Sequence, residues 1–473
     1  MPHCRRCIST GRTCDGYSSR TASPTRSIEV MPNPSHSTGL FASVTERQSF
    51  HYFQLHAGKA LGGYFNQPFW GRSVMQAAIH DAPIRHLVVA LGAAYRIFED
   101  GSGECMAFVL QQCNRSIREL ASAGNECCVL TASLLFIYLA LVRGHSAEAI
   151  QHVRSAVKLL QSSDQSTHQP DNATSGAAYP VPIAQLRPSI LSVYGQLRGM
   201  IGDPALQAAN RDILVSEMKP ATLFLSVSEA HAYIEQLYHN IIAYLEDAEL
   251  GPPATEELLG VMVARHKELC RALESSQDAL DRLAASVSDK SITILRVYHI
   301  MFVIRLGTDI LRPESRETAF DHTEAYFAEM ISHCELFFSQ DMDQTDHRPE
   351  PPTCSSGSGI VLPLHMIASR CRNPGIRRRA IHFLSTCSRR EGLWDSRLAS
   401  RIVSQTMDIE EQGVISNGTA CAHVVNGGKK IPEEARVRAV KIELQGDKQA
   451  TLRFITGSDW KEGGEGVKKS IQW

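Results

Sequence analysis

The residues best suited to chemistry lie at the start of the chain. Cys4, Cys7 and Cys14 are spaced C-x2-C-x6-C. Two thiolates separated by two residues can bind one metal ion at about 2.3 Å, and zinc favours such soft ligands in a tetrahedral arrangement. Gly11 and Gly16 give the intervening loop freedom to turn. The spacing therefore predicts a zinc site in which three thiolates leave one tetrahedral position for another ligand.

The same segment is locally basic. Arg5, Arg6 and Arg12 surround the cysteines, and Asp15 is the one acidic residue before Glu29. The whole chain has a formal net charge of −2, which excludes a general attraction to nucleic acid. A contact with DNA phosphates would therefore come from these arginines. The alternative interpretation is three cysteines with no common metal, because short cysteine patterns recur by chance.

Length and composition indicate a globular protein with reduced thiols. The 473 residues are 43% hydrophobic and include 13 cysteines, an odd number. No apolar segment opens the chain, so we expect no signal peptide and a cytosolic or nuclear location. The longest apolar run, 134–142, is far shorter than the roughly 20 residues of a membrane span. We expect it to be a buried helix and expect no membrane partner.

Helical periodicity dominates from residue 46. Ile84, Leu87, Val88 and Leu91 lie at i, i+3, i+4 and i+7. Such a stripe is stable only when it is packed, so a multi-helix core is expected. Further helices are predicted at 148–160, 226–246, 255–283, 288–312, 319–339, 363–371, 374–390 and 395–411.

Other segments interrupt this pattern. Residues 18–45 are rich in Ser, Thr and Pro and are predicted to form a flexible linker. Loops are expected near 162–187 and 341–359, and residues 457–473 are expected to be a tail. Val440, Ile442 and Leu444 alternate with polar residues, and apolar residues at 452 and 454 follow a Gly-Asp turn, which predicts a β-hairpin. The predicted fold class is mainly α, with a multi-helix domain at 46–456 and this C-terminal β-hairpin.

The cysteine segment is similar to part of a known motif. With Pro2 before Cys4 and Asp15-Gly16-Tyr17 after Cys14, it resembles the second half of the six-cysteine, two-zinc cluster of fungal transcription factors. Residues 50–70, 82–95, 377–411 and 431–444 resemble, in the expected order, the fungal-specific regulatory domain that follows this cluster.

The resemblance implies a function and an organisation. Residues 1–17 would be a partial zinc-cluster segment in which Cys4, Cys7 and Cys14 hold structural zinc and Arg5, Arg6 and Arg12 contact DNA. Residues 46–456 would be a helical regulatory domain without catalytic activity. The chain would act in the nucleus as a sequence-specific regulator of RNA polymerase II transcription. Its implied partners are DNA, a second copy of the chain and the transcription machinery.

One departure from the family pattern leaves two hypotheses open. The first half of the cluster, which carries the basic recognition helix, does not precede Cys4 in this sequence. We expect either that it lies upstream in a longer protein or that it has been lost. In the first case the chain as given binds DNA weakly. In the second it is a helical interaction protein or co-regulator that does not bind DNA.

The remaining candidates have ordinary structural interpretations. An enzyme is supported only by the 19 histidines, since no G-x-S-x-G or H-E-x-x-H motif occurs. Trp70 and Trp394 are expected to be core anchors rather than ligand-stacking groups, and 357–359 a linker rather than a phosphate loop. A run of arginines is expected to form the solvated face of two helices rather than an import or phosphate-binding patch: Arg370, Arg372, Arg377, Arg378, Arg379, Arg389 and Arg390.

Overall fold

The computed structural model describes eleven stretches of the chain. They are residues 39–101, 106–123, 125–166, 181–201, 211–249, 255–287, 289–308, 317–340, 351–416, 431–445 and 448–473. The chain divides into two units, Met1–Ala42 and Ser43–Trp473. The second unit begins three residues before the boundary expected from periodicity, and every element described below belongs to it. Within the described residues the fold is mainly α-helical, as predicted.

A first group of helices occupies the N-terminal part of this unit. Helix α5 begins beside Pro83, whose fixed φ suits a first helical turn, and ends at Gly101, which has a φ of 67°. Its predicted apolar stripe is buried. The group comprises α2 (Val44–Tyr52), the π-helical η2 (Phe53–Ala57), α3 (Gly58–Gly62), the π-helical η3 (Phe69–Ser73), α4 (Val74–His80), α5 (Ala82–Asp100), α6 (Met106–Ala123), α7 (Glu126–Arg143) and α8 (Ser146–Ser166).

Helix α7 is the central helix of this group. It packs against α5, α8 and α9. By length and composition alone it could cross a membrane, and no other described helix passes that test. Its apolar residues are nevertheless taken up by neighbouring helices, since 67% of it is buried. The prediction that the apolar run 134–142 forms a buried helix is confirmed.

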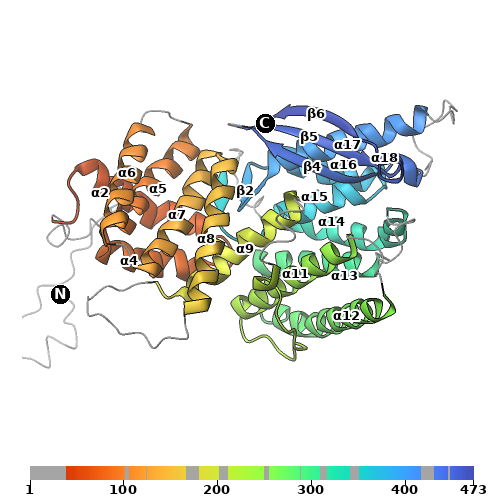
Figure 1. Cartoon of the computed structure of the whole chain (residues 1–473), viewed down its shortest axis with the longest axis horizontal. Helices are drawn as coiled ribbons and strands as arrows, with labels where there is room; N and C mark the ends of the chain where they lie inside the picture. Colours follow the sequence, from red (N-terminus) through yellow and green to blue (C-terminus); the bar gives the residue numbers. More distant parts are fainter. Residues whose placement is uncertain are drawn as a thin grey trace, which may run out of the picture. The chain divides into compact units, whose positions relative to one another are not determined.

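A second group of helices follows, and Figure 1 shows α9 running between the two groups. Helices α12 and α13 begin at side-chain N-caps, Thr255 and Asp289, which accept hydrogen bonds from backbone N–H groups of the first turn. The loop expected near 162–187 is shorter than predicted, because α8 continues to Ser166 and α9 begins at Ile183; residues 167–180 lie outside the described chain. The group comprises α9 (Ile183–Ile201), η4 (Arg211–Ile213), α11 (Val227–Glu249), α12 (Glu256–Ala284), α13 (Lys290–Gly307), the 3-10 segment η6 (Thr318–Thr323) and α14 (Glu324–Ser339).

A small sheet and three helices come next. Strand β1 (Thr353–Ser355) pairs in parallel with β2 (Arg389–Glu391), which pairs antiparallel with β3 (Trp394–Asp395). Two predictions are wrong here: residues 353–355 form a strand within the loop expected across 341–359, and α16 ends at Thr386 although its helix was predicted to continue to 390. Strands β1 and β2 have three residues each, which is too few to show the alternation of apolar and polar residues that marks a strand. The helices are α15 (Val361–Arg370), α16 (Pro374–Thr386) and α17 (Ser396–Ser416).

The C-terminal sheet has three antiparallel strands in the order β4-β5-β6. The predicted hairpin is confirmed: β4 (Val437–Leu444) pairs with β5 (Gln449–Thr456), with Val440 opposite Phe454. Leu452 and Phe454 pack against Leu398 and Ile402 of α17.

The segment 457–473 is not a tail. It forms α18 (Gly457–Glu462) and β6 (Val467–Gln472), which pairs with β5. Thr456 and Asp459 form a capping box that starts α18. Nearly all side chains of β6 are exposed. The strand is therefore held by backbone pairing, and no apolar alternation marks it in the sequence.

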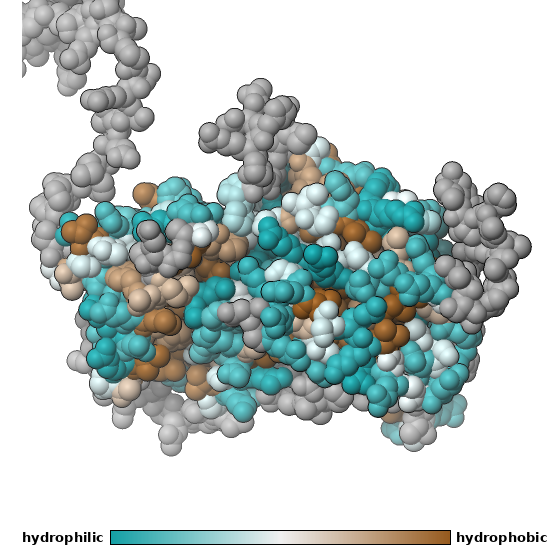
Figure 2. All heavy atoms as spheres, turned by 90° about the horizontal axis from the view of Figure 1, so that it is seen from above, coloured by the Kyte–Doolittle hydropathy of each residue, from teal (hydrophilic) through white to brown (hydrophobic). Residues whose placement is uncertain are grey.

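The surface is mixed in polarity. On the face shown in Figure 2, hydrophobic residues lie in separate groups bordered by hydrophilic ones.

Candidate functional site

The residues predicted to bind zinc and DNA lie outside the described part of the chain. Cys4, Cys7, Cys14, Arg5, Arg6 and Arg12 all precede residue 39. Among the described residues, no group of three or more His, Cys, Asp and Glu side chains could hold a metal ion. The zinc prediction is therefore neither supported nor opposed by the fold of the helical unit.

The described cysteines are suited to packing rather than to metal binding. Cys113, Cys334, Cys354 and Cys371 are buried and form no disulfide. Burial raises the pKa of the Cys113 and Cys371 thiols to about 11. A neutral thiol is a poor nucleophile and a poor zinc ligand.

Three histidines of the N-terminal helices have ordinary partners. His86 Nδ1 lies 2.6 Å from Gln112 Oε1, and His145 Nδ1 lies 3.1 Å from Glu148 Oε2. The His152 ring stacks on Phe136. These contacts satisfy the rings within the helical framework and leave no acid–base arrangement among them.

The arginines near α15 and α16 are not all on a solvated face. Glu410 of α17 is fully buried and accepts hydrogen bonds from Arg372 and Arg377, each at 2.7 Å, and from the Val437 backbone N–H at 2.9 Å. Arg370 pairs with Glu317 at 2.6 Å. The prediction holds for Arg378 and Arg379, whose side chains are exposed, and is wrong for these three. Periodicity marked their positions but gave no sign of the distant carboxylates that pair with them.

The Gly-Ser-Gly segment before α15 faces a carboxylate that belongs to the protein. The Glu391 carboxylate accepts a hydrogen bond from the Val361 backbone N–H at 2.7 Å, at the start of α15. A Cβ on Gly359 would lie 2.2 Å from this carboxylate. Burial raises the pKa of Glu391, while Arg389 and the helix N–H groups oppose that shift. The place where a phosphate would bind in a phosphate loop is thus occupied by Glu391, in agreement with the linker interpretation.

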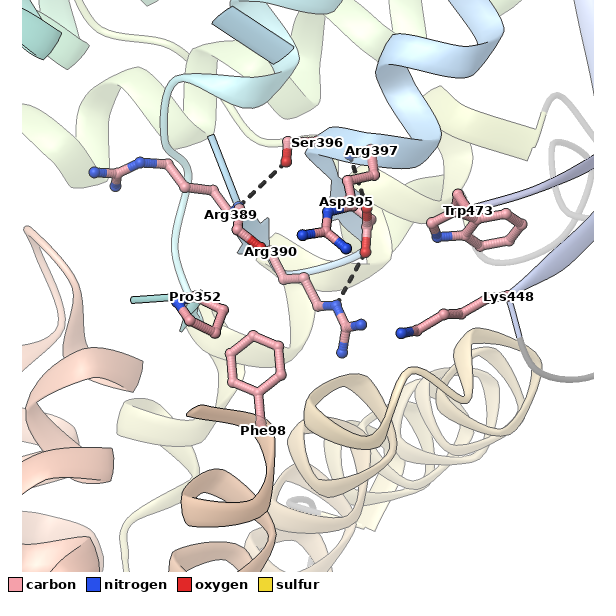
Figure 3. A pocket seen from close by; sticks show the side chains of 10 residues that line it. Phe98, Pro352, Arg389, Arg390, Asp395, Ser396, Arg397, Lys448 and Trp473 are labelled. Atoms are coloured by element: carbon pink, nitrogen blue, oxygen red, sulfur yellow. Dashed lines mark hydrogen bonds and ion pairs between the residues drawn. The ribbon is translucent and has the colours of Figure 1, made fainter. Parts of the chain in front are cut away.

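A basic pocket of about 180 Å³ lies beside the small sheet (Figure 3). Strand β2 supplies Arg389 and Arg390, the start of α17 supplies Arg397, and Lys448 comes from the turn before β5. Asp395 is the one acidic side chain among the described residues that line it. The excess of positive charge makes it a candidate site for an anion.

Two of these cations are already committed to the fold. Arg390 pairs with Asp395 at 3.0 Å, donates to the Leu141 and Val142 carbonyls at the end of α7, and lies 4.9 Å from the Phe98 ring centroid. In Figure 3 the Arg389 side chain extends away from Arg390, and its guanidinium lies over the Phe337 ring. Among the described residues, the cations that remain for a ligand are Arg397 and Lys448. Both are exposed, so the pocket can attract an anion but offers few buried donors to select one.

The lining hydroxyl of this pocket does not form a catalytic arrangement. Ser396 Oγ donates to the Cys387 carbonyl at 2.7 Å and accepts from the Arg389 N–H at 3.2 Å. No histidine lines the pocket among the described residues. The site therefore lacks the adjacent base that a serine nucleophile needs.

The described unit is thus mainly helical, and several of its charged residues, Glu410 and Arg390 among them, join separate elements. Comparison with known proteins supports a regulatory class. The chain is 24% identical, over 92% of its own length and 88% of the relative's, to the aspercryptin biosynthesis cluster-specific transcription regulator atnN of Emericella nidulans. No family profile and no solved structure matches the chain. The similarity extends through nearly the whole chain and supports a fungal transcription regulator, a class that is generally not enzymatic.

Proposed function

We propose that this protein regulates transcription in the nucleus by contacting DNA through its N-terminal cysteine segment. The observation that carries the proposal is the similarity to a transcription regulator over 92% of the chain. The C-x2-C-x6-C spacing with its flanking arginines supplies the DNA-binding chemistry, and no group of three or more His, Cys, Asp and Glu side chains among the described residues could hold a metal ion. The class of target proposed is a biosynthesis gene cluster, since the relative is named as a biosynthesis cluster-specific regulator.

Zinc would be held by Cys4, Cys7 and Cys14. Their thiolates supply three of the four ligands of a closed structural site, so the donor set fits zinc but is one ligand short. In the complete two-zinc cluster, further cysteines would supply the missing ligands. Zinc would then order the segment so that Arg5, Arg6 and Arg12 face phosphates.

DNA binding by the 473-residue chain is expected to be weak and mainly electrostatic. We would measure it by mobility shift and by zinc analysis of the purified protein. The expected result is at most one loosely held zinc per chain and an affinity that falls steeply with salt, with little preference for sequence. Extending the chain upstream to include a second C-x2-C-x6-C, where the gene encodes one, should give tight, sequence-selective, zinc-dependent binding.

Variants separate specific contact from general charge. Replacing Arg5 and Arg6 with alanine should abolish the residual DNA binding. Replacing Lys468 and Lys469, two exposed lysines that are consecutive in the sequence, with alanine should not. If no second cysteine triplet is encoded and neither pair affects DNA binding, the chain is instead a helical interaction or co-regulator protein. Tight, zinc-dependent, sequence-selective binding by the 473-residue chain would contradict the expectation of a half-cluster.

A further inference from the structure

A second cavity, of about 150 Å³, lies between helices of the second group on one side and α15 and β3 on the other. Helices α9, α11, α13 and α15 and strand β3 contribute its walls. Most of the lining is apolar, and includes Ile241, Leu245, Met301 and Phe302. A cavity of this size with apolar walls can hold a molecule as large as one benzene ring. It is separate from the basic pocket described above, with which it shares no lining residue.

Three side chains with polar groups line the cavity, namely Trp394, Tyr238 and His365. Trp394 and Tyr238 are each 6% exposed, and the Trp394 indole N–H is buried and unpaired among the described residues. The His365 ring lies against Trp394, with ring centroids 4.9 Å apart. Burial and the neighbouring Arg370 lower the pKa of His365 to about 4, so its imidazole is neutral at neutral pH and has one donor and one acceptor.

Gly199 makes room for the tyrosine hydroxyl. A Cβ at this position would lie 3.0 Å from Tyr238 Oη and 3.5 Å from Ile242 Cδ1. Both neighbours also line the cavity. The Tyr238 hydroxyl therefore lies at the cavity wall formed by α9. That wall leaves room for it because α9 has no side chain at Gly199. Gly195, one turn earlier, has a different role, since its close neighbour is the His239 ring.

The charged residues that line the cavity are cations, and one of them, Arg370, is already paired with Glu317. Arg305 and Arg370 are its charged lining residues, and no carboxylate lines it among the described residues. Tyr238 and Trp394 can donate hydrogen bonds to an acceptor, and a neutral His365 can do so as well. Apolar walls with a few convergent polar groups are typical of small-molecule sites.

We propose that this cavity binds a small organic acid, a molecule with an apolar body of about one ring and a single carboxylate. Its body would lie against Met301 and Phe302, and its carboxylate would accept hydrogen bonds from Tyr238 and Trp394. The suggestion that this acid is an effector of transcription rests on the function proposed above. The proposal that the cavity binds it does not depend on that function. Binding and transcription are therefore measured separately.

Trp394 links the cavity to other elements of the fold through the residue that follows it. The next residue, Asp395, accepts hydrogen bonds from the backbone N–H groups of Arg397 and Leu398 and so fixes the start of α17. Asp395 also pairs with Arg390, which holds the end of α7. A ligand that binds one position of Trp394 better than another would shift the population of that arrangement.

The test uses the full chain labelled with 5-fluorotryptophan, which gives one fluorine resonance for each of its four tryptophans. Comparison with Trp394→Phe assigns the Trp394 resonance. Sodium benzoate and its uncharged isostere benzamide are the probes. We expect benzoate to shift the Trp394 resonance saturably and to leave that of the exposed Trp460 in place. Benzamide should bind about tenfold more weakly, because hydrogen bonds to a charged acceptor are the stronger ones.

Variants locate the binding site. Gly199→Ala should weaken benzoate binding at least about tenfold by narrowing the cavity, and Tyr238→Phe should weaken it by about the same factor through the lost hydroxyl. The matched control is Gly260→Ala, at a helical glycine with nothing near its Cβ position. Circular dichroism of each variant verifies that it is folded.

Three results would overturn the proposal. The Trp394 resonance could stay unmoved by benzoate at about 10 mM, a concentration that exceeds the dissociation constant of any useful site. Benzamide could bind as tightly as benzoate, which would remove the preference for an acid. Gly199→Ala and Tyr238→Phe could both bind benzoate as the unmodified chain does, which would place the ligand elsewhere.

Discussion

At the scale of single residues, several buried charges form pairs that connect distant segments of the described chain. Glu410 joins α16 and β4 to α17, and Arg436 pairs with Asp321 across more than one hundred residues of sequence. A buried carboxylate is costly unless its lone pairs are satisfied, and Glu410 meets that condition with two guanidinium groups and one backbone N–H. These pairs therefore specify how the segments fit together.

Replacing Glu410 with alanine should lower the free energy of unfolding by about 3–5 kcal/mol, because the buried Arg377 loses its counterion and Arg372 keeps only the more distant Glu317, at 3.5 Å. Urea unfolding followed by circular dichroism measures the change. The neighbouring Glu411 is the control: it is 3.6 Å from Arg378 and both side chains are exposed. Glu411→Ala should cost less than about 1 kcal/mol. Equal effects of the two substitutions would contradict a structural role for the buried network.

At the scale of elements, close helix contacts depend on where glycine stands. Gly92 lies within α5 at its contact with α2, and a Cβ there would be 2.1 Å from the Ser49 carbonyl oxygen. Gly260 lies within α12, and nothing is within 4 Å of its Cβ position. Both glycines reduce helix propensity, but only the first allows two helices to approach.

The same substitution at these two glycines should have opposite effects. Gly92→Ala should destabilise the protein by about 1–3 kcal/mol, because the helices must separate to admit a methyl group. Gly260→Ala should stabilise it by up to about 1 kcal/mol through helix propensity alone. Thermal and urea unfolding of both variants provide the measurement. A stabilised Gly92→Ala protein would show that α2 and α5 are not packed as closely as described.

At the scale of the whole molecule, buried histidines make stability depend on pH. His231 and His239 of α11 and His299 of α13 are buried, and burial lowers the pKa of each ring. His365 of α15 behaves in the same way. In the unfolded chain their pKa is about 6.5. Below that pH the unfolded state therefore takes up protons that the folded state does not.

The free energy of unfolding should be greatest above about pH 7 and fall as the pH drops through 6.5 toward the lower folded-state pKa values. Each such histidine contributes at most about 1.4 kcal/mol per pH unit to this loss. Urea unfolding at pH 7.5, 6.5 and 5.5 measures it. His299→Gln, which removes one titrating ring, should make the decrease shallower. A free energy that does not change between pH 7.5 and 5.5 would contradict this account.

Local patterns predicted many of the helices but neither α6 nor α9, and they predicted the short strands poorly. The stripe of α5 and the apolar run of α7 follow from side-chain spacing, so the sequence carries them directly. Strand β1 lies where a loop was expected, and its place depends on contacts far away: the Cys354 N–H donates to Tyr95 Oη at 3.0 Å. Nearly all side chains of strand β6 are exposed, so its backbone pairing with β5 holds it in place.

For the functional sites, what could be predicted from sequence depends on how far apart the contributing residues are along the chain. The sequence by itself determined the candidate zinc ligands, the helical class and the hairpin, because these depend on spacing within a few residues. Only the tertiary structure decided that Arg372 and Arg377 are buried beside Glu410, and that Trp394 meets Tyr238 and His365 at one cavity. Those contacts join side chains that are tens to more than one hundred residues apart, and no local period encodes which distant groups come together.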